Sequence, residues 1–232
     1  MAEPEKTGKT LWEMFSERLR ATGNGPGAAL TLSNPLDLRV SSAVLVARAN
    51  GPEFAAYDFT VKEIREYLRQ LGGQAFVFTD YVLRGVNRNT FDSSDELVAR
   101  LRVVPNPAGG HDSLLLTLDD EFGFAEDFLA VVKDTTGVFE VTGDSSGATE
   151  TFSRVNDLRD SYQAAVLVVS ATTQDGKAPP AQTVRAKVEY WDYWRDVDLG
   201  ADATAKEFLF VELNSDTGWF QIWRVREFFA GS

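Results

Sequence analysis

The stretch FLFVELNSDTGWFQIWRV, residues 208–225, carries the clearest structural signal in this chain. Two runs rich in aromatic and β-branched residues, 208–213 and 219–225, flank a polar segment at 214–218 that ends in glycine. Such runs on either side of a short polar, glycine-containing segment are typical of a β-hairpin. The sequence therefore predicts antiparallel strands in the C-terminal part of the chain.

The same kind of pattern extends through the N-terminal half. Apolar residues alternate with polar ones at 57–61, at 97–103 and less regularly at 76–82, and compact apolar runs occupy 41–47 and 114–118. Alternation with a period of two is typical of strands with one buried face. We therefore expect a mainly β fold, α+β at most, preceded by a short helix that starts near Leu11.

Residues 61–71 fit two structures. Val61, Ile64, Leu68 and Leu71 lie at helical spacing, and Gly72 follows as a helix cap would. A strand fits as well, because Gly72 and Gly73 separate this segment from the next apolar one as a hairpin turn does. The strand is favoured and the helix remains open.

Comparison of the chain with itself reveals five similar segments in the same order. The matches are 37–41 with 157–161, 43–46 with 165–168, 63–69 with 189–195, 76–80 with 208–212, and 100–102 with 224–226. This order predicts an internal duplication, that is, two diverged tandem antiparallel units of about four strands each, related by a pseudo-two-fold axis in one compact body.

The predicted organisation follows from these matches. Residues 1–36 form an N-terminal helix and linker, 37–104 the first β unit, 105–156 a connector and 157–232 the second β unit. Apolar runs predict further strands in the connector at 114–118, 128–132 and 138–141.

Composition excludes several classes of function. The chain of 232 residues has 23 Lys and Arg against 35 Asp and Glu, a net charge of −12, which opposes binding to nucleic acid or to an anionic membrane. It has no Cys and a single His, so disulfides and thiolate or poly-His metal sites are excluded. No apolar run approaches the roughly 20 residues of a membrane span, and the N-terminus lacks a signal-peptide core. A soluble, cytoplasmic protein is expected.

Charged residues recur in both predicted units, and they allow two interpretations. Arg69 matches Arg195, and Arg100 and Arg102 belong to an Arg-x-Arg pair found in each unit. One interpretation is cross-strand ion pairs on a solvated sheet face. The other is a groove between the units in which these guanidinium groups bind an acidic peptide or an anionic ligand.

The segment 189–196, EYWDYWRD, concentrates aromatic residues. A strand here places aromatic side chains on both faces, so one set, such as Trp191 with Tyr193 or Tyr190 with Trp194, is a candidate contact surface for a partner. The alternative is a strand that is buried on both faces and covered by the connector.

An acidic segment follows directly. Asp196, Asp198, Asp202 and Glu207 lie at positions 1, 3, 7 and 12, a spacing similar to that of the Ca²⁺ ligands in an EF-hand loop. Gly200 and Ala201 occupy positions 5 and 6, where a ligand and a glycine are expected, and no helices flank the segment. An acidic hairpin tip fits better than a Ca²⁺ site, and no other cofactor is indicated.

No residues form a recognisable catalytic constellation. The sequence favours a non-catalytic binding or scaffold module that contacts a protein or peptide through the aromatic strand or the cleft between units, with homodimerisation through sheet edges as a further expectation. Two alternatives remain: a metal-assisted or acid/base hydrolase acting on a sugar or phosphoester, and a carrier of a small ligand in an apolar cavity between the units.

Overall fold

The computed structural model describes most of the chain from residue 36 onward. The described residues are 36, 38–44, 54, 56–71, 74–90, 96–106, 109–142, 148–155, 162–170, 184–200 and 203–229. The expected N-terminal helix and the glycines between the two segments at 61–71 and 76–82 lie outside these residues.

The described part of the chain is mainly β, as expected. Its strands are β1 (Ala43–Val44), β2 (Tyr57–Leu71), β3 (Gln74–Asn87), β4 (Glu96–Pro105), β5 (His111–Gly123), β6 (Val138–Thr142), β7 (Thr149–Arg154), β8 (Tyr162–Ser170), β9 (Val184–Gly200), β10 (Ala203–Asn214) and β11 (Trp219–Phe229). The hairpin predicted from residues 208–225 is formed by β10 and β11.

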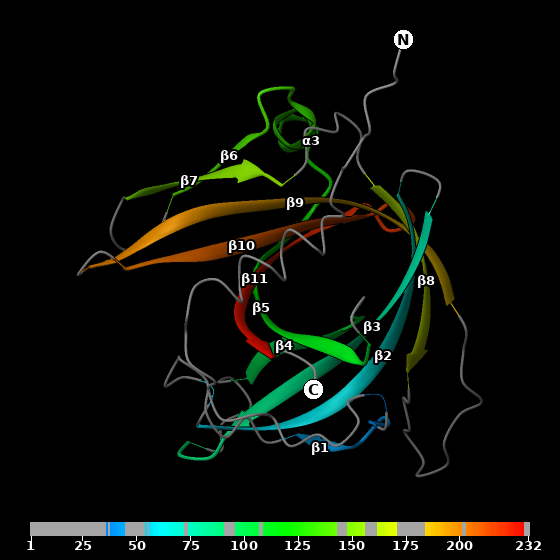
Figure 1. Cartoon of the computed structure of the whole chain (residues 1–232). Coiled ribbons are helices and arrows are strands. Elements are labelled where there is room, and N and C mark those ends of the chain that lie inside the picture. Colours follow the sequence, from blue (N-terminus) through cyan, green and yellow to red (C-terminus); the bar gives the residue numbers. More distant parts are fainter. Residues whose placement is uncertain are drawn as a thin grey trace.

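All eleven strands of the described residues belong to one antiparallel sheet that closes on itself. Its order is β1-β2-β3-β4-β5-β11-β10-β9-β7-β6, and β8 pairs with both β2 and β9. The strands β2, β3, β4, β5, β11, β10, β9 and β8 therefore form a ring, whose curved strands are visible in Figure 1. The strand β1 and the β6–β7 hairpin lie outside this ring.

The registers assign each side chain to one face of the closed sheet, because directly paired residues point the same way. The outer face carries two apolar clusters. One packs β2 to β5 against residues 38, 44 and 54 from the N-terminal side. The other packs β9 to β11 against α3 (Glu126–Lys133), β6 and β7. The inner face carries two further clusters and a group of charged side chains.

Residues 61–71 are strand, and a β-bulge explains why they also fit a helix. Val61 pairs with Leu83, but the next ladder pair is Glu63 with Val82, so Lys62 is an extra residue. The bulge moves the following residues to the opposite face. Val61 and Ile64 consequently share the outer face at a spacing of three, which imitates helical periodicity.

The expected strand at 128–132 is wrong, since these residues belong to α3. Phe128 and Leu129 lie four and three residues before Val132, so the three form one apolar stripe, which packs on the outer cluster. Acidic residues in the first turn and Lys133 in the last turn suit the helix dipole. The other connector strands, at 114–118 and 138–141, are present within β5 and β6. Within the described residues, no helix has the length and apolar character needed to cross a membrane.

The predicted duplication is matched in strand order but not in every side chain. Strands β1 to β4 and strands β8 to β11 both run as consecutive antiparallel neighbours. Asp80 and Glu212, at matched positions, both face inward. Glu66 is exposed and its counterpart Asp192 is buried, while the register places Arg100 on the inner face and Arg224 on the outer face. Arg159 lies outside the described residues, and the duplication stays a prediction.

Candidate functional site

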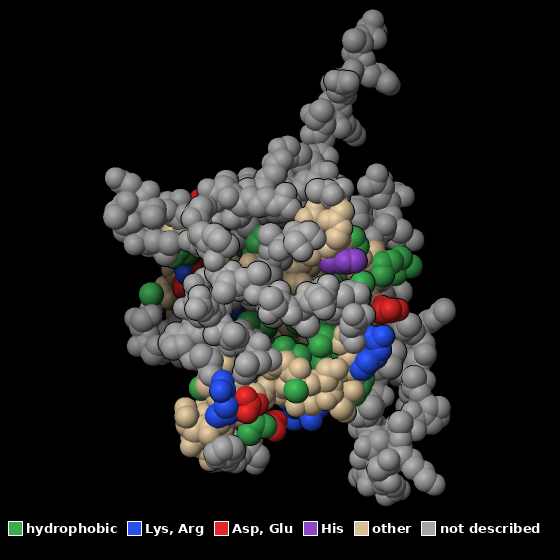
Figure 2. Space-filling view, turned by 60° about the horizontal axis from the view of Figure 1, so that its bottom comes forward, with side chains coloured by type: hydrophobic (Ala, Val, Ile, Leu, Met, Phe, Trp, Pro, Cys, Tyr) green, Lys and Arg blue, Asp and Glu red, His purple; other side chains and the backbone are tan. Residues whose placement is uncertain are grey.

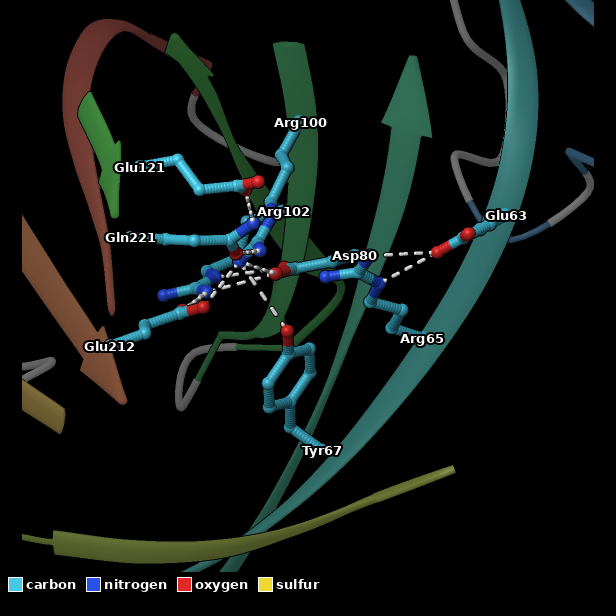
Figure 3. A network of polar contacts seen from close by, with 9 residues as sticks. All are labelled: Glu63, Arg65, Tyr67, Asp80, Arg100, Arg102, Glu121, Glu212 and Gln221. Atoms are coloured by element: carbon cyan, nitrogen blue, oxygen red, sulfur yellow. Dashed lines mark hydrogen bonds and ion pairs between the residues drawn. The ribbon is translucent and has the colours of Figure 1, made fainter. Parts of the chain in front are cut away.

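A cluster of buried charged side chains lies inside the closed sheet. Asp80 comes from β3, Arg100 and Arg102 come from β4, and Glu212 comes from β10. Each of these residues is less than 10% exposed. Figure 3 shows them pointing toward one another across the space that the strands enclose. The cluster therefore joins walls of the ring that are not neighbours in the sheet.

Arg102 is held on two sides. Its Nε and Nη2 donate to Oδ1 and Oδ2 of Asp80 at 2.8 Å each, and Nη2 also donates to Oε1 of Glu212 at 2.9 Å. Its guanidinium carbon lies 4.5 Å from the ring centre of Phe78 and 5.2 Å from that of Phe210. The bidentate ion pair and the rings together fix the plane of this guanidinium.

Arg100 spans the interior in a different way. Its Nη1 donates to Oε2 of Glu212 at 2.6 Å and its Nη2 to Oε1 of Gln221 at 2.6 Å. Nη1 also lies 3.4 Å from the hydroxyl oxygen of Tyr67 and 3.5 Å from Oδ2 of Asp80. The guanidinium carbon lies 3.7 Å from the ring centre of Trp223, so one face of the guanidinium stacks on the indole.

The charges within this cluster balance. Burial alone would raise the pKa of Glu212, but Arg100 and Arg102 outweigh it and lower the pKa to about 2. Burial alone would lower the pKa of Arg102, but Asp80 and Glu212 hold that pKa above its ordinary value. Burial raises the pKa of Tyr67 to about 12 despite the nearby Arg100. At neutral pH Glu212 is therefore ionised and the Tyr67 hydroxyl is neutral.

Further polar side chains flank the cluster on two sides. Gln221 accepts from Arg100 and donates its Nε2 to the carboxylate of the exposed Glu121. Arg65 is paired with Asp80 in the β2–β3 register and donates to Glu63 at 2.8 and 2.9 Å. Figure 3 shows Glu121 and Glu63 on opposite sides of the buried cluster.

Apolar and aromatic side chains form the rest of the described inner face. The larger inner cluster contains Leu114, Leu116, Phe208, Phe210 and Trp223, with Val98, Leu118, Trp194, Val225 and Phe228 packed against it. The smaller contains Tyr67, Phe78, Val188 and Tyr190, with Val104 and Ala186. The rings of Tyr67 and Phe78 stack at 4.7 Å. The interior thus combines an aromatic lining with a few convergent polar groups.

Two buried nitrogen donors on this inner face lack a hydrogen-bond partner among the described residues. They are Nε of Arg100, whose other guanidinium nitrogens are engaged, and Nε1 of Trp223. Arg100 and Trp223 are 0% and 2% exposed and stack on each other. Buried donors without an acceptor are uncommon in proteins, so an acceptor is expected at each of these two nitrogens.

The aromatic segment of β9 is covered on both faces, as the second of the two sequence interpretations states. Trp191 and Tyr193 are 2% and 0% exposed and pack beneath α3, β6 and β7 on the outer face. Tyr190 is buried on the inner face, and Trp194 is half-buried there. Neither Trp191 nor Tyr193 forms an exposed contact surface, because the connector folds over them.

The predicted arginine residues are divided between the two faces. Arg100 and Arg102 are buried and ion-paired, so the expectation of a solvated sheet face is wrong for them. Arg195 lies on the outer face, where it binds Glu207 at 2.5 Å and Glu150 at 2.6 Å. Arg69 lies on β2, opposite Phe76 and Ala164.

The acidic segment is a strand connection in which Glu207 points away from Asp196 and Asp198. Asp196 and Asp198 lie on β9, and Asp196 pairs with Lys206 on the facing strand. Glu207 is next to Lys206 in β10 and therefore points to the opposite face, where Arg195 and Arg224 bind it. These pairs lower the pKa of Glu207 although burial opposes them. Asp202 lies outside the described residues, within which no group of three or more metal-ligating side chains occurs.

Several exposed acidic and basic side chains of the described residues lie next to one another. Figure 2 shows acidic and basic side chains next to one another on the face it presents. Ion pairs such as Arg84 with Glu96 at 2.9 Å and Arg88 with Asp58 at 3.1 Å are of this kind. Exposed pairs of this kind contribute little to stability.

The sequence alone does not identify several residues of the interior site. Asp80, Tyr67 and Glu212 belong to the repeated segments, and Trp223 belongs to a predicted hairpin strand, without a further mark of function. The sequence does mark Asp80 and Glu212 as candidates for burial, since each lies two residues after a Phe-x-Phe segment on an otherwise apolar strand. A single carboxylate on such a strand indicates a buried partner of opposite charge.

Comparisons with known proteins do not assign this chain to a family. No family model matches it, and neither a curated protein nor a solved structure matches it.

Proposed function

We propose that the protein binds a small, mainly apolar molecule inside the closed sheet. The observation that carries this proposal is the inner face, where buried aromatic and aliphatic side chains surround a few convergent polar groups. Binding sites for small molecules have this composition. Closed antiparallel sheets of about eight strands enclose either packed side chains or one small ligand.

The other functions considered from the sequence have less support. Binding of a protein through Trp191 and Tyr193 requires these residues at the surface, and both are buried. An acid/base hydrolase requires carboxylates that are available for proton transfer, whereas Asp80 and Glu212 are both held by guanidinium groups. Binding of a small molecule inside the ring requires neither exposure of these aromatic residues nor release of these carboxylates from their ion pairs.

We infer that the chain contains a duplicated four-strand unit, of which three strands of the first copy and all four of the second belong to the ring. Strands β1 to β4 and β8 to β11 share their order, and Asp80 and Glu212 occupy matched positions from which both bind Arg102. In this view the ligand site lies between the two halves, as expected for a carrier built from two units.

The test is a titration of the protein with 2-(dimethylamino)naphthalene, an apolar molecule whose fluorescence emission reports binding. Leu116 faces the interior and Leu115, its neighbour on β5, faces the outer cluster; both are at most 1% exposed. We expect saturable binding at one site that Leu116→Phe weakens by about tenfold, corresponding to about 1.4 kcal/mol. The matched variant Leu115→Phe adds the same volume to the outer cluster and should leave binding unchanged.

Two results would overturn the proposal. One is the lack of saturable binding by the unmodified chain. The other is equal weakening by Leu115→Phe and Leu116→Phe, because the effect then comes from general overpacking of the sheet. Near-ultraviolet circular dichroism of both variants establishes that the packing around the aromatic residues is retained.

A further inference from the structure

We infer that the ligand is neutral and carries a hydrogen-bond acceptor, such as a ketone or amide oxygen, that binds at Nε of Arg100 and Nε1 of Trp223. This inference rests on the proposed function and adds the chemical class of the ligand. It is carried by the two unpartnered donors and by the balance of charge around them.

The two donors belong to a rigid part of the interior. The terminal nitrogens of Arg100 are fixed by Glu212 and Gln221 at 2.6 Å each, so the direction of its Nε–H is fixed as well. The indole of Trp223 stacks on that guanidinium at 3.7 Å. Both groups are already in place before a ligand arrives, and preorganised donors lose little entropy on binding.

The chemistry of the donors defines what they accept. The Nε–H of arginine and the Nε1–H of tryptophan only donate, so the complementary ligand atom is an acceptor. A buried donor left without an acceptor costs about 1–3 kcal/mol. A ligand oxygen at this position removes that cost, which a hydrocarbon of the same shape does not.

The same cluster disfavours a negatively charged ligand. Arg100 and Arg102 are matched by Asp80 and Glu212, and the depressed pKa of Glu212 keeps its charge at neutral pH. A carboxylate at Nε of Arg100 would add a negative charge beside Glu212 in a desolvated interior. A neutral oxygen makes the hydrogen bond without this repulsion.

The experiment compares three fluorescent naphthalenes that share a dimethylamino group. They are 2-(dimethylamino)naphthalene, its 6-propionyl derivative and its 6-carboxylate. We expect the propionyl compound to bind about tenfold more tightly than the parent, the equivalent of one hydrogen bond to a buried donor, and the carboxylate to bind no better than the parent.

Two tryptophan variants connect the preference to the site. Trp223→Phe keeps an aromatic ring and removes the N–H, and it should reduce the preference for the propionyl compound to about twofold. Trp219→Phe makes the same change at the start of the same strand, where the side chain is 48% exposed, and should retain the full preference.

The outcomes separate the two proposals. If none of the three compounds binds, the proposed function fails. If all bind equally well and Trp223→Phe changes nothing, the function stands and the acceptor inference is overturned, because the donors are then satisfied by water alone. Preference for the carboxylate also overturns it.

Discussion

Asp80 and Glu212 bind the same guanidinium from two strands that are not neighbours in the sheet. Nη2 of Arg102 donates to Oδ2 of Asp80 at 2.8 Å and to Oε1 of Glu212 at 2.9 Å. Asp80 lies on β3 and Glu212 on β10, so the contact crosses the interior of the ring. It fixes the positions of the two walls relative to each other, in addition to the backbone ladders that run around the ring.

Loss of charge at Glu212 should destabilise the fold strongly. Glu212→Gln leaves one carboxylate, that of Asp80, for the two buried guanidinium groups of Arg100 and Arg102. We expect the free energy of unfolding, measured with urea, to fall by about 3–5 kcal/mol. The control Glu96→Gln breaks an exposed pair with Arg84 and should cost less than about 1 kcal/mol. Equal losses in the two variants would show that the buried cluster does not contribute to stability.

Acid should destabilise the protein in a pH range set by Glu212. Its pKa is lowered from 4.5 to about 2 in the folded chain, so folding favours the ionised form. The resulting stability is fully present above the unfolded pKa and is lost as the pH falls from about 4.5 toward 2. We expect a loss on the order of 3 kcal/mol across this range, and Glu212→Gln should remove that part of the slope. An unchanged slope in the variant would assign the acid sensitivity to other carboxylates.

The sequence predicts the strands better than it predicts their closure. Residues 208–225 identify a hairpin because both of its strands and its turn are local. The contact of Arg100 with Glu212 joins residues 112 positions apart, and it depends on β8 pairing with both β2 and β9. Nothing in the local pattern of β8 indicates two partners, so the position of Arg100 inside the ring could not be derived.

Bulges limit the sequence prediction in a second way. The extra residue Lys62 reverses the faces of all later residues in β2, so Tyr67 points inward. In β11 the register shifts between Val225 and Glu227. Alternation alone assigns the wrong face after each bulge. Arg100 and its sequence match Arg224 differ for another reason, since Asp80 pairs with Arg102 whereas Glu212 pairs with Gln221, an odd number of residues before Arg224.

Trp191 should act as a core residue. It is 2% exposed in the outer cluster with Phe139 and Phe152 from the covering hairpin. Trp191→Ala should lower the free energy of unfolding by about 3–5 kcal/mol, the usual cost of removing a large buried ring. Trp219→Ala, at 48% exposure, should cost less than about 1 kcal/mol. A change of similar size in the two variants, measured by urea unfolding, would contradict the packing of the hairpin over β9.

Gly85 provides the space for the ring of Phe59 on the facing strand. The two residues are directly paired, and a Cβ at Gly85 would lie 2.7 Å from Cε1 of Phe59 and 3.1 Å from Cβ of Tyr57. Phe59 is 1% exposed, so its ring has no room to move aside. Gly85→Ala should therefore destabilise the fold by about 1–3 kcal/mol in urea unfolding.

Gly123→Ala is the matched control, because nothing lies within 4 Å of a Cβ there, and its effect should be within about 0.5 kcal/mol. Combining Gly85→Ala with Phe59→Leu should recover part of the loss relative to the sum of the single variants, because the smaller side chain relieves the clash. Strictly additive effects would mean that the ring of Phe59 does not oppose a side chain at position 85.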